Sequence, residues 1–156
     1  MASEAPERTV RDITHLLNSA GHLMSNRLAA ALAEVGLTPR MQCVLAHALE
    51  RERTQIELAA LADLDKTTMV TTVDELEKRG LAERRPSSTD RRARIVAVTE
   101  RGRRAAAEGQ RIVDEVHLDA LDGLSPESRQ AFLDALSRLA GIRGPGPQPV
   151  RRPRGR

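Results

Sequence analysis

A chain of 156 residues has the usual length of one domain, with or without an added dimerisation element. Apolar residues make up 40% of it, but Phe occurs once and Trp and Tyr are absent, so a core must be aliphatic, which favours closely packed helices. No segment approaches the roughly 18 apolar residues of a membrane span, and the N-terminus lacks the apolar run of a signal peptide. We therefore expect a soluble, cytoplasmic protein with no membrane partner. A single cysteine, Cys43, excludes an internal disulfide and a multi-cysteine metal site.

The net charge is only +3, but the charges are unevenly distributed along the chain. Residues 143–156 carry five arginines and no acidic residue, and residues 78–104 carry ten basic and three acidic residues, a net of +7. The rest of residues 1–142 has a net charge of −9. A positive segment on an acidic body is typical of a surface that binds the phosphate backbone of a nucleic acid, although a solvated charged face gives the same count.

Two helices are predicted in the first third of the chain. The first is a long amphipathic helix with an apolar stripe at three- and four-residue steps, formed by Val10, Ile13, Leu17, Ala20, Met24, Leu28 and Ala31. Gly36 is a stop signal, Thr38 a candidate N-cap and Pro39 a favoured first helical residue. The second helix then runs to about Glu50, with four residues facing inward: Met41, Val44, Leu45 and Ala48.

Two short helices with a brief link between them follow. The segment TQIE is a capping box, in which the Thr54 and Glu57 side chains satisfy backbone donors, and it opens a helix over residues 55–62. Asp65 is a candidate N-cap for a helix over residues 66–79, which Gly80 closes. This pattern is typical of a helix-turn-helix, although ordinary helical hairpins look similar.

The following segments change to a strand-like pattern. LAERR and ARIVAVT are compatible with β-strands, and PSSTDRR between them predicts a two-stranded hairpin with a long tip. Thr99 is a candidate cap for a helix over residues 100–121, and Ser125 with Pro126 begins a last helix to about residue 140. Residues 143–156 are rich in Pro, Gly and Arg and are predicted to be disordered; their arginines either add non-specific DNA affinity or are inert.

A helix-turn-helix followed by a hairpin is the winged-helix arrangement, in which the second helix lies in the major groove and the wing reaches an adjacent minor groove. The segments LTPRMQCVL and TQIELAALADLDKTTMVTTVDELEKRGLAERRPSSTDRRARIVAVTERG, with the flanking helices, resemble the MarR (multiple antibiotic resistance regulator) family of bacterial transcription factors over about residues 10–140. The resemblance implies a mainly α fold: a winged helix-turn-helix domain with a two-stranded wing, plus N- and C-terminal helices that form a dimerisation region. The implied segments are an N-terminal dimerisation helix (1–36), the DNA-binding domain (37–99), C-terminal dimerisation helices (100–142) and a disordered basic tail (143–156).

The function that the resemblance implies is transcriptional regulation, with repression as the expected mode. A homodimer binds a pseudo-palindromic, double-stranded DNA operator, and in many relatives a small, often phenolic, ligand or an oxidant releases the DNA. The resemblance implies no cofactor. Because no nucleophile–base pair and no paired carboxylates are evident, an enzyme is not expected. The alternative is a winged-helix dimer that binds acidic protein or RNA without reading a DNA sequence.

The resemblance assigns DNA-binding roles to the recognition helix. The assigned residues lie on its exposed, N-terminal side: Lys66, Thr67, Thr68, Val70 and Thr71. The methyl groups of Val70 and Thr71 are expected to contact thymine methyls, and the hydroxyls of Thr67 and Thr68 to bond phosphates or base edges. Val70 is otherwise a tolerated surface valine. Many relatives have arginine where this chain has Thr71, so the operator sequence cannot be taken from them. Three residues are expected to pack inward: Met69, Val73 and Leu76.

In the wing, Asp90 and Arg92 match the family's Asp-x-Arg pattern. Arg92 is expected to enter the minor groove, with Arg91 and Arg94 beside it, while Asp90 holds a neighbouring arginine in place. Arg84 and Arg85 belong to a strand and are expected to be phosphate or surface contacts; Arg84 is the one placed in the DNA-binding set.

Dimerisation and ligand binding are assigned from the remaining residues. The apolar stripes of the first helix and the last two helices exceed what a small winged-helix core can cover, so a dimer is expected to bury them. The predicted interface includes Val10, Ile13, Leu17, Val116, Leu133, Leu136 and Leu139. The candidate ligand pocket comprises His15, His22, Met41 and His47, although these histidines are otherwise interfacial or solvated. Cys43 is read as a small core residue rather than a peroxide sensor, and no metal site is predicted because no histidine or acidic cluster has ligand spacing.

Overall fold

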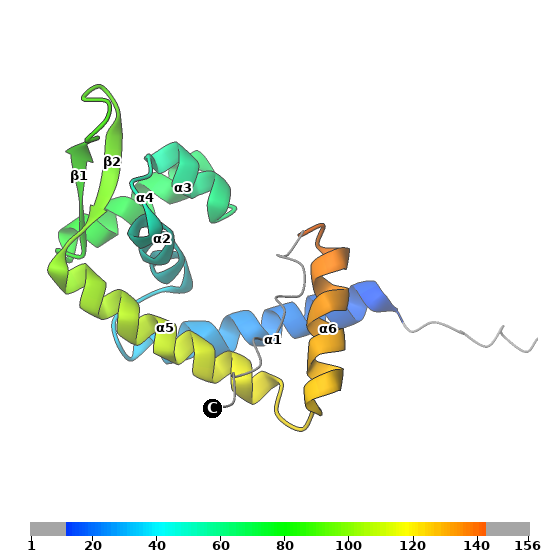
Figure 1. The fold of residues 1–156 in the computed structure, drawn as a ribbon. Coiled ribbons are helices and arrows are strands. Elements are labelled where there is room, and N and C mark those ends of the chain that lie inside the picture. Colours follow the sequence, from blue (N-terminus) through cyan, green and yellow to red (C-terminus); the bar gives the residue numbers. More distant parts are fainter. Residues whose placement is uncertain (1–11, 143–156) are drawn as a thin grey trace, which may run out of the picture. The chain divides into compact units, whose positions relative to one another are not determined.

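The computed structural model describes residues 12–142 of the chain (Figure 1). It contains six helices and one hairpin: α1(Ile13–Ala33), α2(Pro39–Glu50), α3(Gln55–Leu61), α4(Lys66–Lys78), β1(Ala82–Pro86), β2(Arg94–Val98), α5(Glu100–Ala120) and α6(Pro126–Leu139). The predicted mainly helical fold with a two-stranded wing is confirmed. The chain divides after Ala120 into two compact units, the first holding α1 to β2 with α5 and the second holding α6.

The predicted starts of α2, α3, α4 and α6 are confirmed by the caps that set them. The Thr38 hydroxyl accepts the Met41 N–H at 3.2 Å, and the Asp65 carboxylate accepts the Thr68 N–H at 2.9 Å. Gly36 and Gly80, which follow α1 and α4, have φ angles of +72° and +67°, a conformation that disfavours residues with a Cβ. The capping box of Thr54 and Glu57 and the Ser125 N-cap are also present.

The start of the first helix differs from the prediction. The stripe placed it near Val10, but α1 begins at Ile13 because the Asp12 carboxylate caps it by accepting the His15 N–H at 3.1 Å. Val10 lies outside the described residues. Only Leu32 of α1 is fully buried, and the apolar stripe does not include it.

The wing is an antiparallel hairpin that is also tied to the helix-turn-helix. Its register pairs Ala82 with Val98 and Pro86 with Arg94. On the other side of β2, the Val96 N–H donates to the Arg53 carbonyl at 3.1 Å, and Thr54 forms an isolated bridge with Ile95. The residues just before α3 therefore act as a short third strand, which fixes the hairpin beside the two helices.

The core of the first unit lies between α2, α4, α5, the hairpin and the C-terminal end of α1. The inward-facing residues that were predicted on α2 and α4 are confirmed: Met41, Val44, Leu45, Met69, Val73 and Leu76 are fully buried, and Ala48 packs against them. Leu58 of α3 is equally buried. This core fixes one face of α4 and leaves the opposite face outside it.

Two glycines let α5 approach its neighbours closely. A Cβ on Gly102 would lie 1.9 Å from the Leu81 carbonyl oxygen, and one on Gly109 would lie 2.1 Å from Oε1 of Gln42. The buried Gln42 donates from Nε2 to the Ala106 carbonyl at 3.1 Å, a bond between α2 and α5. A glycine within a helix costs about 1 kcal/mol relative to alanine, so close packing is the reason for both.

Apolar side chains remain exposed on α1 and on α6. On α1 they are Ile13, Leu16, Leu17 and Leu23. On α6, which has no buried residue, they are Phe132, Leu133 and Leu139. Val116 and Leu136, which were also predicted to lie in an interface, are half-buried.

Candidate nucleic-acid interface

The recognition helix α4 presents a short polar surface at its N-terminal end. It begins at Lys66, and its buried face is anchored by residues such as Val73 in the core. Of the five residues that the resemblance placed on the exposed side, Lys66, Thr67 and Thr71 are exposed, whereas Thr68 and Val70 are half-buried. Val70 thus lies at the edge of the surface and not at its centre.

Local hydrogen bonds already use the hydroxyl groups of two of the threonines that were assigned to DNA contact. The Thr68 hydroxyl donates to the Asp65 carboxylate, and the Thr71 hydroxyl donates to the Thr68 carbonyl at 2.9 Å. A hydroxyl has a single hydrogen to donate, so only the acceptor lone pairs and the methyl groups of these threonines are left for another molecule. Thr67 is the exposed threonine of α4 whose hydroxyl forms no hydrogen bond with the described residues 12–142.

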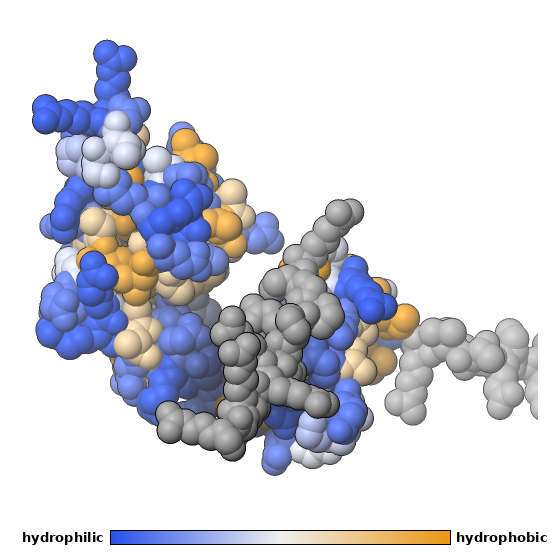
Figure 2. Space-filling view, viewed as in Figure 1, coloured by the Kyte–Doolittle hydropathy of each residue, from blue (hydrophilic) through white to orange (hydrophobic). Residues whose placement is uncertain are grey.

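The wing tip carries three exposed cations. Arg91, Arg92 and Arg94 are exposed, and none of them forms an ion pair with another residue in the described part of the chain. Figure 2 shows the tip as a hydrophilic projection. Such guanidinium groups suit a polyanion, because they can neutralise phosphates or enter a narrow minor groove without breaking existing bonds.

Asp90 organises this tip through hydrogen bonds to the backbone. Its carboxylate accepts the backbone N–H of Arg92 at 2.9 Å, and its carbonyl accepts the N–H of Ala93 at 3.0 Å. It forms no ion pair with a neighbouring guanidinium within residues 12–142. Asp90 therefore closes a turn and fixes the backbone from which the Arg92 side chain projects.

Arg84 points to the helix-turn-helix instead of outward. Its guanidinium donates to Asp74 of α4 at 2.7 Å, to Glu77 of α4, and to Gln55 of α3 at 3.0 Å. The sequence alone placed Arg84 among the DNA contacts, since it could not show these partners. In this conformation each of its three guanidinium nitrogens donates to a protein group.

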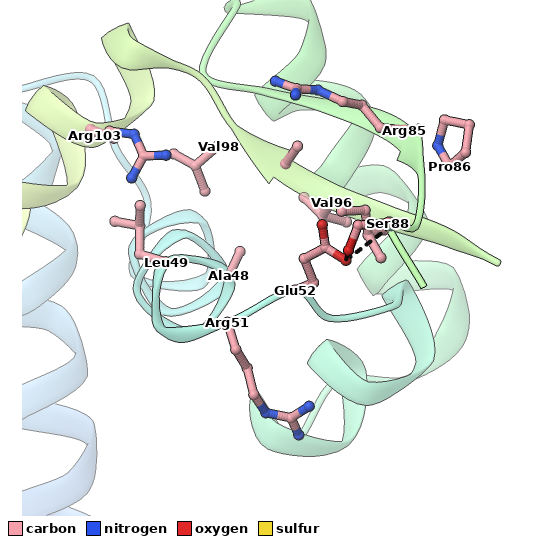
Figure 3. A pocket seen from close by; sticks show the side chains of 12 residues that line it. Ala48, Leu49, Arg51, Glu52, Arg85, Pro86, Ser88, Val96, Val98 and Arg103 are labelled. Carbon is pink, nitrogen blue, oxygen red and sulfur yellow. Dashed lines mark hydrogen bonds between the residues drawn. The ribbon is translucent and has the colours of Figure 1, made fainter. Parts of the chain in front are cut away.

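A second link to the wing involves Glu52, which sequence reasoning did not identify. The Glu52 carboxylate accepts the N–H of Ser88 at 3.2 Å and the hydroxyls of Ser88 and Ser87 at 2.8 Å and 3.3 Å (Figure 3). These bonds favour the ionised carboxylate and lower the pKa of Glu52. The loop between α2 and α3 is thereby tied to the base of the wing tip.

Arg53, beside it, is a buried cation that was also missed. It donates to the His47 carbonyl and, through Nη2, to the Glu50 carboxylate at 2.7 Å. A guanidinium at the C-terminal end of α2 satisfies a free carbonyl and complements the helix dipole. Arg53 thus fixes the linker that orients α3.

An open groove of about 450 Å³ lies between the end of α2, the wing and the start of α5. Its apolar wall includes Leu49, Val96 and Val98, with Ser88 and Glu52 toward one end and Arg103 toward the other (Figure 3). None of the four residues predicted to form a ligand pocket lines it.

Those four residues lie in different environments. Met41 is buried in the core, and His47 is half-buried at the end of α2, whereas His15 and His22 are exposed on α1. Cys43 is half-buried, and burial raises the pKa of its thiol, which favours the less reactive protonated form.

Comparison with known proteins decides which family this arrangement belongs to. The model of the MarR family matches residues 35–93. CouR from Rhodococcus jostii RHA1, solved with p-coumaroyl-CoA, is 33% identical with a TM-score of 0.76; the alignment covers 86% of this chain and 95% of CouR. A MarR-family transcriptional regulator from Rhodococcus sp. RHA1 is 33% identical with a TM-score of 0.74, covering 88% of this chain and 96% of that one. The chain belongs to the MarR family.

A further similar structure, also of a CouR protein, was solved on DNA. The transcriptional repressor CouR, bound to a 23-mer DNA duplex, is 30% identical with a TM-score of 0.74, and the alignment covers 82% of this chain and 92% of that one. The family assignment makes this chain a transcriptional regulator of the winged-helix class. Among residues 12–142, no helix is long and apolar enough to cross a membrane.

Proposed function

We propose that this MarR-family regulator is a homodimeric, ligand-responsive repressor that binds a pseudo-palindromic DNA operator. The observation that carries the proposal is the pairing of two outward-facing surfaces on one compact unit: the start of α4 and the arginine-bearing wing tip. The first has the size and polarity for a major groove, and the second has the charge for an adjacent minor groove.

The roles within α4 follow from which groups are available. Lys66 and the Thr67 hydroxyl bond phosphates or base edges, because both are exposed at the helix N-terminus. The methyl groups of Thr71 and Val70 contact thymine methyls at the edge of the same surface. Thr68 contributes as an acceptor, because its hydrogen is bonded to Asp65.

At the wing, Arg92 enters the minor groove and Arg91 and Arg94 neutralise flanking phosphates. Asp90 fixes the turn from which Arg92 projects. Arg92 thus reads the shape of the groove, whereas Arg91 and Arg94 add positive charge. The two types of contact can be told apart, because loss of a phosphate contact lowers the salt dependence of DNA binding.

A second copy of the chain covers the exposed apolar side chains. Ile13 and Leu17 on α1, and Leu133 and Leu139 on α6, are exposed in the single chain, which is unfavourable for a protein that remains alone in water. A two-fold dimer buries such faces and places two recognition helices about one DNA turn apart, as a pseudo-palindromic operator requires.

A small anionic or aromatic molecule acts as the effector. What supports this is the p-coumaroyl-CoA bound to CouR, a relative that is 33% identical. His15, His22 and His47 remain the proposed ligand contacts, whereas Met41 acts only through the core that it fills. Thermal-shift screening with phenolic acids and their CoA thioesters tests this, because a ligand of the folded dimer raises its melting midpoint.

The experiment that tests the proposal as a whole is footprinting of the DNA upstream of the protein's own gene. The proposal predicts protection of two half-sites about 10 base pairs apart, centre to centre, which an RNA of similar length does not compete away. Equal binding to any DNA or RNA, with no protected site, would support the alternative, a winged-helix dimer that serves as an interaction module.

A further inference from the structure

Two of the three acidic side chains of the recognition helix, Asp74 and Glu77, lie beside strand β1 of the wing. Asp74 is 59% exposed and Glu77 is 33% exposed, so neither is a core group. If α4 lies against DNA, each carboxylate repels the phosphate backbone. Their presence on α4 therefore requires a reason other than DNA contact or core packing.

Both carboxylates are held by Arg84 of β1. Nη2 of Arg84 donates to Oδ1 of Asp74 at 2.7 Å, and Nη1 donates to Oε2 of Glu77. The backbone N–H of Arg84 donates to the other oxygen of Glu77 at 2.8 Å, and Nε donates to Gln55 at 3.0 Å. One residue of the wing is thus bonded to both helices of the helix-turn-helix.

We propose that Arg84, Asp74 and Glu77 are positioning residues that hold the wing at a fixed distance and angle from α4. The inference rests on the proposed function, because it concerns how two elements reach two grooves of one site. Holding both elements in the bound geometry before DNA arrives avoids an ordering cost on binding. Arg84, whose side chain is only 28% exposed, acts through this arrangement and not through a phosphate.

The chain contains a matched control in the next residue. Arg85 lies on the same strand, carries the same charge and is 55% exposed, but its guanidinium pairs with Glu83 of its own strand. Replacing Arg85 removes an equal charge from the wing without touching the link to α4. A difference between the two substitutions therefore isolates the link.

The first test compares Arg84→Met with Arg85→Met on the footprinted operator and on a shuffled duplex, over a range of salt concentrations. Positioning predicts that Arg84→Met loses about tenfold in operator affinity, or about 1.4 kcal/mol, with little loss on the shuffled duplex and an unchanged salt slope. Arg85→Met retains the ratio of the two affinities. Equal losses of Arg84→Met on both duplexes, with a salt slope lower by about 1, would identify a phosphate contact and overturn the inference.

The second test removes the acids instead of the arginine. The double substitution Asp74→Asn with Glu77→Gln deletes two negative charges beside the DNA, so simple electrostatics predicts tighter binding to any duplex. Positioning predicts weaker operator binding, and little further loss when Arg84→Met is added, because the three residues act as one unit. Tighter operator binding by the double variant contradicts the inference.

A third measurement needs no DNA. Amide hydrogen exchange of β1 and β2 in the free protein is expected to be faster in Arg84→Met than in Arg85→Met, because the wing opens more often when its link is lost. Unchanged protection of the wing overturns the inference whether or not the protein prefers an operator. Failure of the wild-type protein to prefer any operator contradicts the proposed function alone.

Discussion

The carboxylate of Asp90 accepts the backbone N–H of Arg92 at 2.9 Å, so an acidic residue shapes the most basic part of the wing. An acid at a DNA-facing tip repels phosphate, and its effect on binding is the difference between that repulsion and the benefit of a fixed turn. The two terms can be separated, because asparagine retains an acceptor oxygen without the charge, whereas alanine retains neither.

Replacing Asp90 by alanine and by asparagine is therefore expected to affect operator binding differently. Asp90→Ala weakens operator binding by about 1 kcal/mol, the value of one hydrogen bond, although it removes a negative charge. Asp90→Asn binds as tightly as the wild type or more tightly. Fluorescence anisotropy with a labelled operator measures both, and equal affinities of the two variants would show that the turn has no role.

Arg92→Ala is expected to lower operator affinity by about 1–3 kcal/mol. Because the Arg92 side chain is exposed and forms no ion pair within residues 12–142, the free energy of unfolding changes by less than about 0.5 kcal/mol. The control is Arg101→Ala, which removes an exposed arginine of α5 and retains affinity. Equal effects of the two substitutions on DNA binding, or a large loss of stability in Arg92→Ala, argue against a minor-groove contact.

Local signals in the sequence predicted the elements of this fold, and contacts between distant residues account for what was missed. Caps such as Asp65 act over three residues, so their pattern is visible in the chain itself. The bond from Gln42 to Ala106 spans 64 residues, and that from Ser88 to Glu52 spans 36, so no periodicity reveals them. The role of Arg84 was assigned from charge alone and changed once its acidic partners were known.

The close approach of α5 gives a stability prediction with an internal control. Gly102→Ala and Gly109→Ala are each expected to destabilise the protein by about 1–3 kcal/mol, because the added methyl group meets the Leu81 carbonyl or the Gln42 side chain. Gly21→Ala on α1 has no atom within 4 Å of its added Cβ and is expected to stabilise by up to about 1 kcal/mol. Urea unfolding measures all three, and similar effects at the three sites would contradict the packing described for α5.

The proposed dimer interface is tested by placing a charge in it. Leu17→Glu and Leu133→Glu are expected to give monomers in light scattering, because a carboxylate buried against a second apolar face has no partner. Ile56→Glu on α3 is the control: Ile56 is 82% exposed and lies outside the proposed interface, so this variant remains a dimer. A monomeric wild-type protein, or a dimer that tolerates both substitutions, would exclude these faces as the interface.

The most direct measurement is the ratio of affinities for the footprinted operator and for a shuffled duplex of the same composition, taken at several salt concentrations. If α4 and the wing read DNA as proposed, the ratio is about 10³ or more, and operator affinity falls steeply as salt rises. Arg92→Ala lowers the ratio. A ratio near 1 for the wild-type protein would mean that these surfaces hold a polyanion without reading its sequence, and the account of this protein as an operator-binding repressor would be wrong.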